Sequence, residues 1–158
     1  MSKESVEAVT AYLDGQGIDY ELVEHEKRFT AAGEARVSGV EPGDAAKDLI
    51  LREGNSYALA VIPASERLDL GKARELLGAS KALRLATEEE IGRDFKRFEV
   101  GAIPPFGPLH EIRQVVDRRL LEHERVLCSA GDHGRSVLVD PNEMVRVTEA
   151  RLGDLCEE

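Results

Sequence analysis

Three short segments of the chain contain residues whose types and spacing could support chemistry. Residues 101–107 (GAIPPFG) hold two prolines, which fix φ near about −65° and lack N–H donors, between glycines that let another molecule approach the backbone closely. Lys47 stands at the start of an apolar run, and His133 lies in a glycine-rich turn, residues 130–134 (AGDHG). Backbone N–H groups beside the first glycine could stabilise a developing oxyanion, Lys47 could bind one phosphate as a point charge, and His133 could orient a ligand by hydrogen bonding.

Each of these segments also has a purely structural interpretation. The proline-rich segment, which cannot be a helix interior or a central strand, could be a rigid crossover between two elements. Lys47 could be a solvated lysine at a strand end, and His133 could be a residue of a surface turn. Ser129 lacks the strand–nucleophile–helix pattern of a hydrolase elbow, which favours a pocket wall over a nucleophile. The three other histidines are assigned no function.

Length, charge and cysteine content restrict the class of protein. A chain of 158 residues suits one domain, and with 4% aromatic residues and no tryptophan its core must rest on aliphatic side chains. The net charge of −10 disfavours broad binding to a phosphate backbone, so a nucleic acid partner would have to be held locally. Cys128 and Cys156 show no metal-ligand spacing, which predicts reduced thiols and no metal site. Because there is no apolar signal region and no run of about 18 apolar residues, we expect a soluble cytoplasmic protein.

Hydrophobic periodicity and capping residues predict a set of short helices and strands. Gly54 and Asn55 between two apolar runs indicate a hairpin, which we expect in a central antiparallel sheet. Asp69 and Gly78 predict the two ends of one helix, and Thr87 predicts the start of another through a capping box. Helices are predicted over residues 2–13, 31–37, 69–77, 87–95 and 141–147, and strands over residues 19–23, 46–51, 57–62, 82–85, 112–116, 125–129 and 136–139. This interspersed order predicts one α+β domain over residues 1–158.

The order of several motifs resembles a known family. The motifs are Ala46-Lys47 leading a strand, residues 59–63 (LAVIP), 68–70 (LDL), 77–78 (LG), 101–107 (GAIPPFG) and 130–133 (AGDH). Together they resemble the YbaK family of aminoacyl-tRNA deacylases, which includes the editing domain inserted in bacterial prolyl-tRNA synthetases and its free-standing relatives. The resemblance runs from about residue 25 to residue 148 and depends on order and spacing, since each motif alone is weak.

This resemblance implies a fold, an activity and a set of site residues. The implied fold is a mixed, largely antiparallel, barrel-like sheet flanked by short helices, and the implied reaction is hydrolysis of the ester that joins a wrong amino acid to the terminal adenosine of tRNA. The catalytic roles fall on Lys47, Gly101 and His133. Substrate-binding roles are expected at Ala102, Pro104, Pro105, Gly107, Ser129 and Gly131. No cofactor or metal is implied, and the expected partners are the aminoacyl-tRNA acceptor end and a tRNA synthetase.

One position departs from the family pattern. The family lysine is usually followed by threonine, whereas Lys47 is followed by Asp48. Asp48 could pair with Lys47 and weaken phosphate binding, or it could face the other side of the sheet, because neighbours on a strand point to opposite faces. A non-catalytic module that binds a small aminoacyl-like or nucleotide ligand, or a synthetase, is the alternative function.

Basic residues flank the proline-rich segment on both sides. They are Arg93, Lys96 and Arg97 before it and Arg113, Arg118 and Arg119 after it. They could surround the mouth of a pocket and hold tRNA phosphates, or they could pair with neighbouring acids such as Asp94 and Asp117. The sequence leaves both interpretations open.

Overall fold

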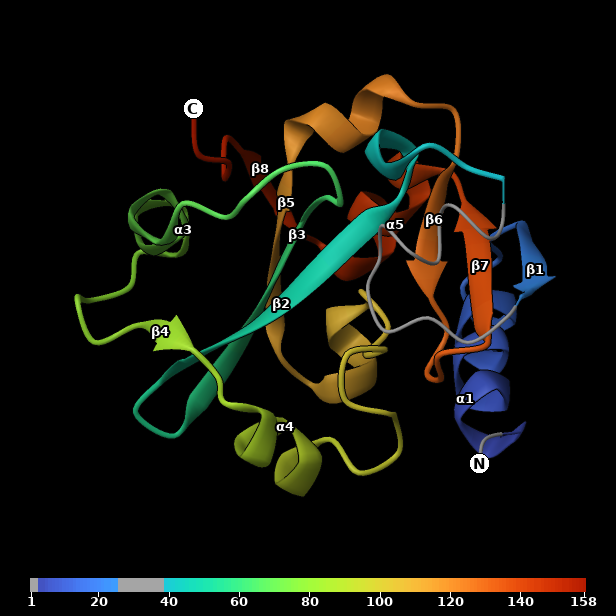
Figure 1. Cartoon of the computed structure of the whole chain (residues 1–158), viewed down its shortest axis with the longest axis horizontal. Coiled ribbons are helices and arrows are strands. Elements are labelled where there is room, and N and C mark those ends of the chain that lie inside the picture. The colour runs from blue at the N-terminus through green and yellow to red at the C-terminus, as the bar shows by residue number, and fades with distance from the viewer. Residues whose placement is uncertain (1–2, 26–38) are drawn as a thin grey trace.

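The computed structural model describes residues 3–25 and 39–158, so the helix predicted over residues 31–37 lies outside the described part. The described helices are α1 (Lys3–Gly15), α3 (Leu70–Leu77), α4 (Glu88–Asp94) and α5 (Pro141–Thr148). The strands are β1 (Tyr20–Glu24), β2 (Ala46–Glu53), β3 (Ser56–Pro63), β4 (Arg84–Leu85), β5 (Arg113–Asp117), β6 (Val126–Ser129), β7 (Arg135–Val139) and β8 (Arg151–Gly153). The α+β class is therefore confirmed, and Figure 1 shows the long β2–β3 hairpin crossing the middle of the molecule.

The strands form two sheets. One has the order β4-β2-β3-β5-β8 and the other the order β1-β7-β6. The expected antiparallel pairing holds for β2 with β3, but β5 runs parallel to β3 and β8 runs parallel to β5, so the central sheet is mixed. Within the described residues the two sheets meet in a single parallel bridge, Ala45 to Leu127, and they do not close into a barrel. The barrel-like expectation is corrected accordingly: closure would need a full ladder between β2 and β6 in place of one bridge.

Capping residues set the helix ends where the sequence predicted them. The Asp69 side chain accepts a hydrogen bond from the Lys72 N–H at the start of α3, and Gly78 ends that helix in the left-handed conformation with φ 67°. Thr87 and Glu90 form a reciprocal capping box at the start of α4. No described helix is long and apolar enough to cross a membrane.

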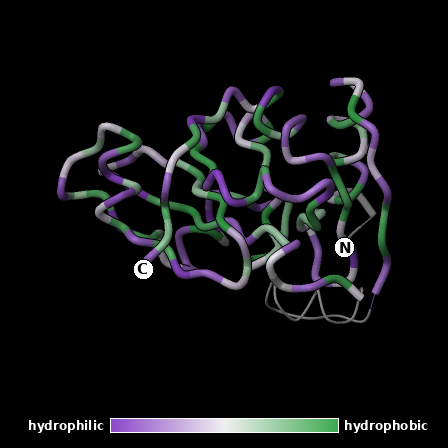
Figure 2. The backbone as a smooth tube through the Cα atoms, turned by 90° about the horizontal axis from the view of Figure 1, so that it is seen from above, coloured by the Kyte–Doolittle hydropathy of each residue, from purple (hydrophilic) through white to green (hydrophobic). Residues whose placement is uncertain are grey.

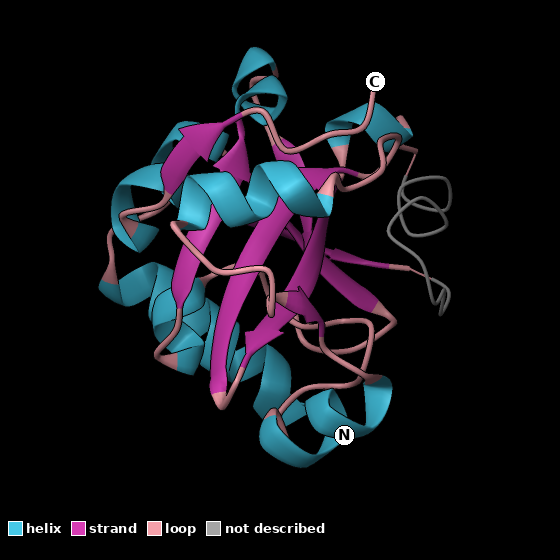
Figure 3. Cartoon of the chain, turned by 90° about the vertical axis from the view of Figure 1, so that its left-hand side faces the viewer, coloured by secondary structure: helices cyan, strands magenta, loops and turns pink. Residues whose placement is uncertain are grey.

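The central sheet has a different hydrophobic cluster on each face. Along β2, Ala46 and Ile50 pack into the larger cluster, which also receives α1, β6 and the proline-rich segment, while Leu51 packs against α3 on the other face. Figure 3 shows helices covering the strands, and Figure 2 shows hydrophobic and hydrophilic stretches alternating along the backbone. Because successive side chains of β2 point to opposite faces of the sheet, neighbours along this strand reach different parts of the molecule.

The C-terminal strand β8 was not predicted. It is three residues long and two of them are exposed, so no apolar run marks it. Its position depends on Asp117, a fully buried carboxylate that accepts hydrogen bonds from the Leu155 N–H (2.7 Å) and the Cys156 thiol (3.2 Å). A long-range side-chain contact of this kind has no local sequence signal.

Candidate functional site

The proline-rich segment lies against the inner face of the central sheet. Ile103 and Phe106 are buried in the larger cluster, and Pro104 and Pro105 between them are buried as well. A side chain at Gly107 would place its Cβ 2.4 Å from the Ile112 carbonyl oxygen, so this position admits only glycine. Most of the segment is thus a packed support, and a ligand can reach it only at its edges.

A buried glutamine holds this segment in place. Gln114, at the start of β5, accepts a hydrogen bond from the Gly107 N–H (2.6 Å) and donates one to the Pro105 carbonyl (2.9 Å). Its exposed fraction is 4%. Sequence reasoning missed this residue, although a polar side chain inside an otherwise apolar strand was the available signal.

The start of the proline-rich segment is hydrogen-bonded to the glycine-rich turn. Glu99 donates its N–H to the Gly131 carbonyl (2.9 Å), and Gly131 donates its own to the Ala102 carbonyl (3.0 Å). The His133 N–H donates to Glu99 Oε1 (2.8 Å), and His133 Nε2 lies 2.8 Å from the Val100 carbonyl oxygen. Because a carbonyl only accepts, Nε2 must carry the proton in this contact. We call residues 99–102 and 130–133 the loop–turn pair.

Gly101 is the exposed residue of the loop–turn pair. Its φ of 88° lies in the left-handed region, which explains the requirement for glycine, and any L side chain there would be strained. The geometry rules out the Ala102 N–H as an oxyanion donor. It already donates to the Glu99 carbonyl (2.9 Å), and Ala102 is fully buried. Within the described residues the Gly101 N–H has no such partner, so it is the donor that the arrangement offers to a ligand.

Gly131 and Ser129 form the wall behind the turn. Gly131 has φ 104°, and a Cβ there would lie 2.8 Å from Phe98 Cδ1 and 2.9 Å from Ser5 Cβ. Ser129 is buried at the end of β6. Gly131 belongs to the loop–turn pair, Ser129 directly precedes it, and both residues are enclosed by protein.

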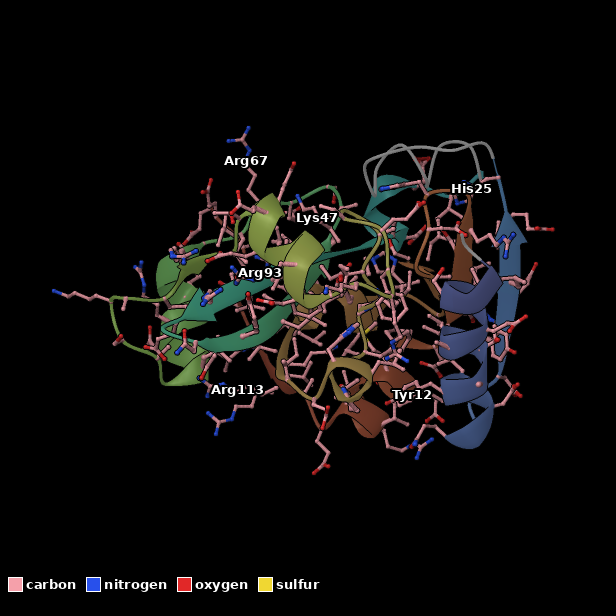
Figure 4. All side chains as sticks on the ribbon, turned by 90° about the horizontal axis from the view of Figure 1, so that it is seen from below. Tyr12, His25, Lys47, Arg67, Arg93 and Arg113 are labelled. Carbon is pink, nitrogen blue, oxygen red and sulfur yellow. The ribbon has the colours of Figure 1, made fainter. Side chains whose placement is uncertain are left out.

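Lys47 is directed toward a different part of the molecule from Gly101 and His133. Its Nζ donates to the Glu66 carbonyl (2.7 Å), on the face of β2 that packs toward α3 and the C-terminal segment. Burial lowers the pKa of Lys47, and Arg67 adds to this effect, while Cys156 and Glu66 oppose it. Figure 4 shows Lys47 and Arg67 on the same side of the molecule. Gly101 and His133 are therefore brought together, and the Lys47 ammonium group is held apart from them by the Glu66 carbonyl.

Asp48 does not pair with Lys47. It alternates with Lys47 along β2, and its cross-strand partner is Val61, a member of the larger cluster. The carboxyl oxygen Oδ2 is buried and has no hydrogen-bond partner among the residues that the structure describes. Burial raises the pKa of Asp48 to about 8, and a hydrogen bond to its own backbone acts in the opposite direction. Of the two possibilities for Asp48, the structure shows the one in which it faces away from Lys47.

The flanking basic residues lie in three different settings. Lys96 and Arg97 line a pocket of about 360 Å³ together with Phe98 and His110, whose Nε2 donates to the Pro104 carbonyl (3.0 Å). Burial lowers the pKa of His110. By contrast, Arg113 donates to the Leu77 carbonyl (2.8 Å), beside α3. Arg93 lines the same pocket as Lys96 and pairs with Asp94, whereas Arg119 pairs with Asp117 and Asp154.

A larger depression lies elsewhere on the surface. It has a volume of about 1150 Å³ and is lined mainly by acidic residues together with His123 and Arg125. His123 pairs there with Asp44. None of the predicted site residues lines this depression, and no group of described residues has the make-up of a metal site.

Comparison with known proteins identifies the family. Residues 25–147 match the model of the aminoacyl-tRNA editing domain. The chain is 26% identical to the prolyl-tRNA editing protein ProX of Acetoanaerobium sticklandii (95% of this chain, 94% of the relative) and 28% identical to the multifunctional Ser/Thr-tRNA deacylase ProXp-y of Escherichia coli (96% and 94%). The crystal structure of a putative trans-editing enzyme for prolyl-tRNA synthetase superimposes with a TM-score of 0.85 at 29% identity over the full length of both chains.

The chain belongs to the aminoacyl-tRNA editing domain family, and the resemblance derived from the motifs is confirmed. Lys47, Gly101 and His133 all lie within the matched range, residues 25–147. The roles of these residues are taken up below as proposals.

The His133 contact leads to the first prediction. Replacing His133 with alanine removes the donor to the Val100 carbonyl and loosens the loop–turn pair. Because one such hydrogen bond contributes about 0.5–1.5 kcal/mol, we expect a roughly twofold to tenfold lower rate of ester hydrolysis and poorer discrimination between amino acids. His133→Gln, whose amide can donate from a similar position, should recover part of both. His123→Ala is the control, and a His133→Ala variant with unchanged rate and discrimination would show that the contact is dispensable.

Proposed function

We propose that this protein is a trans-editing deacylase that hydrolyses the ester between a wrong amino acid and the terminal adenosine of tRNA. The observation that carries the proposal is the loop–turn pair, which presents the exposed Gly101 backbone beside His133 in a chain of the editing family. Relatives named for the editing of prolyl-tRNA and for the deacylation of Ser/Thr-tRNA support this substrate class. We propose that the chain acts as one free-standing domain in the cytoplasm, where tRNA is charged and used.

The chemistry required is modest because an aminoacyl ester is already reactive. Catalysis needs a positioned water molecule, a donor for the oxyanion and a cation for the phosphate of the terminal nucleotide. In our proposal the Gly101 N–H is the oxyanion donor, and His133 holds the loop that presents it. The substrate then packs against the edge of the proline-rich segment, and the buried Ser129 and Gly131 support the turn behind it.

Lys47 is proposed as the phosphate-binding cation. An ammonium group has three N–H donors, and the Glu66 carbonyl takes one of them, so two are available to phosphate oxygens. The contact with Glu66 also holds the side chain in one orientation, which reduces the entropy lost on binding. For Lys47 to act together with Gly101, the terminal nucleotide must reach across the edge of β2 between the two faces of the sheet.

The proposal is tested by incubating the purified protein with a panel of mischarged tRNAs and following loss of the aminoacyl ester. We expect rapid loss for one or a few amino acids and no effect on correctly charged tRNAs. Binding of aminoacyl-tRNA without ester loss on any member of the panel would reject the enzyme and favour a non-catalytic binding module.

The net charge predicts how tRNA is bound. A protein of charge −10 repels a polyanion at long range, so contacts should be limited to about three to five phosphates near the acceptor end. We expect weak binding of uncharged tRNA, with a log–log salt slope between about −2 and −5. Lys96→Ala should reduce this slope by about one unit, because Lys96 lines the pocket beside the proline-rich segment.

Arg113→Ala is the matched control for Lys96→Ala. Arg113 donates to the Leu77 carbonyl beside α3 and lines a different pocket from the one that contains Lys96. Its replacement should leave the slope unchanged. Tight binding of uncharged tRNA, or a slope near −9 as expected for about ten phosphate contacts, would contradict this account.

A further inference from the structure

Asp48 faces the interior behind the loop–turn pair. Ala46 and Ile50, on the same face of β2, pack in the cluster that also contains Ile103 of the proline-rich segment and Ala130 of the turn. The bridge from Ala45 to Leu127 makes β2 and β6 parallel at this point. The start of β2 therefore lies beside β6, which leads into Ala130, where the turn of the loop–turn pair begins.

No described cation compensates this carboxyl group. Lys47, its neighbour in the chain, is bonded to the Glu66 carbonyl on the opposite face, and Asp48 Oδ2 is buried without a partner. The residues of the larger cluster are hydrophobic, and the titratable side chains of the adjoining loop–turn pair are Glu99, Asp132 and His133. A buried carboxyl group in such a place must either hold a proton or receive a cation from a ligand.

We propose that Asp48 recognises the α-ammonium group of the aminoacyl ester and so selects acyl groups that carry a free amine. The inference rests on the proposed function, because the aminoacyl ester is the ligand that would bring an ammonium group to the loop–turn pair. An ammonium beside Gly101 and Asp48 would place the adjacent ester carbonyl near the exposed Gly101 N–H.

Two uncleavable probes separate recognition of the amine from catalysis. They are 3′-(alanylamino)-3′-deoxyadenosine and its N-acetyl derivative, which differ only in the charge and size of the amine. By calorimetry at pH 6.5 we expect the wild type to bind the free-amine probe about 10- to 100-fold more tightly, as for a charge-assisted hydrogen bond. Asp48→Asn should reduce this preference to less than about threefold. Asp19→Asn, an exposed carboxylate outside the site, is the matched control and should change nothing.

Proton release gives a second readout. Because the pKa of Asp48 is raised to about 8, the carboxyl group is protonated at pH 6.5, and pairing with an ammonium group would ionise it. Binding of the free-amine probe should then release close to one proton, measured from the dependence of the binding enthalpy on the ionisation enthalpy of the buffer. Asp48→Asn should release none.

The outcomes distinguish this inference from the proposed function. Preferential binding of the free-amine probe without ester loss from any mischarged tRNA would reject the deacylase and support the role of Asp48. Ester hydrolysis with equal affinity for both probes, or with a preference that survives in Asp48→Asn, would reject the role of Asp48 alone. Failure of the wild type to bind either probe would also overturn it.

Stability against pH checks that the Asp48 variant is folded and that the carboxyl group is buried. The folded-state pKa of about 8 lies above that of the unfolded chain, 3.8, so the folded state binds the extra proton between these values. The free energy of unfolding of the wild type should therefore fall, relative to that of Asp48→Asn, as the pH rises from about 4 to about 8. Parallel pH profiles for the two proteins would show that Asp48 is solvated, which would overturn the inference.

Discussion

Lys47→Ala is expected to lower the rate of ester hydrolysis by about 30- to 150-fold, since a charge-assisted contact to phosphate contributes on the order of 2–3 kcal/mol. The rate to measure is the first-order rate constant for ester loss with protein in excess over mischarged tRNA. The loss should appear in this rate constant while the circular dichroism spectrum and the melting temperature change little. The reason is that Lys47 is only half-buried and makes one hydrogen bond, to the Glu66 carbonyl, within the described structure.

Lys81→Ala provides the matched control for Lys47. Lys81 is exposed in the turn between α3 and β4, away from the proposed site. Its replacement removes the same charge, so any general effect of net charge on tRNA binding appears in both variants. A folded Lys47→Ala protein that hydrolyses the ester as fast as Lys81→Ala would remove Lys47 from the mechanism.

Gln114→Leu is expected to cause the largest loss of stability among the site variants. It leaves the buried Gly107 N–H and Pro105 carbonyl without partners, and each unpaired group costs about 1–3 kcal/mol. We expect the free energy of unfolding in urea to fall by about 2–6 kcal/mol. Ester hydrolysis should fall with it, because the proline-rich segment supports the loop–turn pair.

Gln114→Glu separates the two hydrogen bonds. An ionised glutamate still accepts from Gly107 but turns an oxygen toward the Pro105 carbonyl, whereas the protonated acid can donate to that carbonyl. Burial would raise the pKa of the new carboxyl group, so the stability of this variant should recover as the pH falls. Gln16→Leu, at an exposed position, is the control. A loss below about 1 kcal/mol for Gln114→Leu would mean that the segment keeps its shape without this residue.

The helices that the structure describes were predictable because their signals are local. Asp69, Thr87 and Pro141 each satisfy or remove backbone donors at a helix start, so the starts of α3, α4 and α5 follow from single residues. The β2–β3 hairpin was predictable for the same reason, from its turn residues. The parallel pairing of β5 with β3 and β8 was not, because it depends on contacts between segments far apart in the chain.

The candidate site could be proposed from the sequence, but its geometry could not be predicted. The order of the motifs placed Gly101 and His133 in one site, and the structure brings their segments into contact. The alternation along β2 predicted that Lys47 and Asp48 could face opposite sides, but only the tertiary structure shows which side is the interior. Gln114 could not be recognised as a support, because its two backbone partners are known only once the segment is folded.

The central claim is that the loop–turn pair forms the site of ester hydrolysis, and one rate constant tests it most directly. With protein in excess over the best substrate of the mischarged panel, ester loss should exceed spontaneous hydrolysis in the same buffer by at least about a hundredfold, which corresponds to about 2.7 kcal/mol of transition-state stabilisation. His133→Ala, which loosens the loop–turn pair, should lower that rate constant by roughly twofold to tenfold. A wild-type rate within about twofold of spontaneous hydrolysis for every member of the panel would contradict the account.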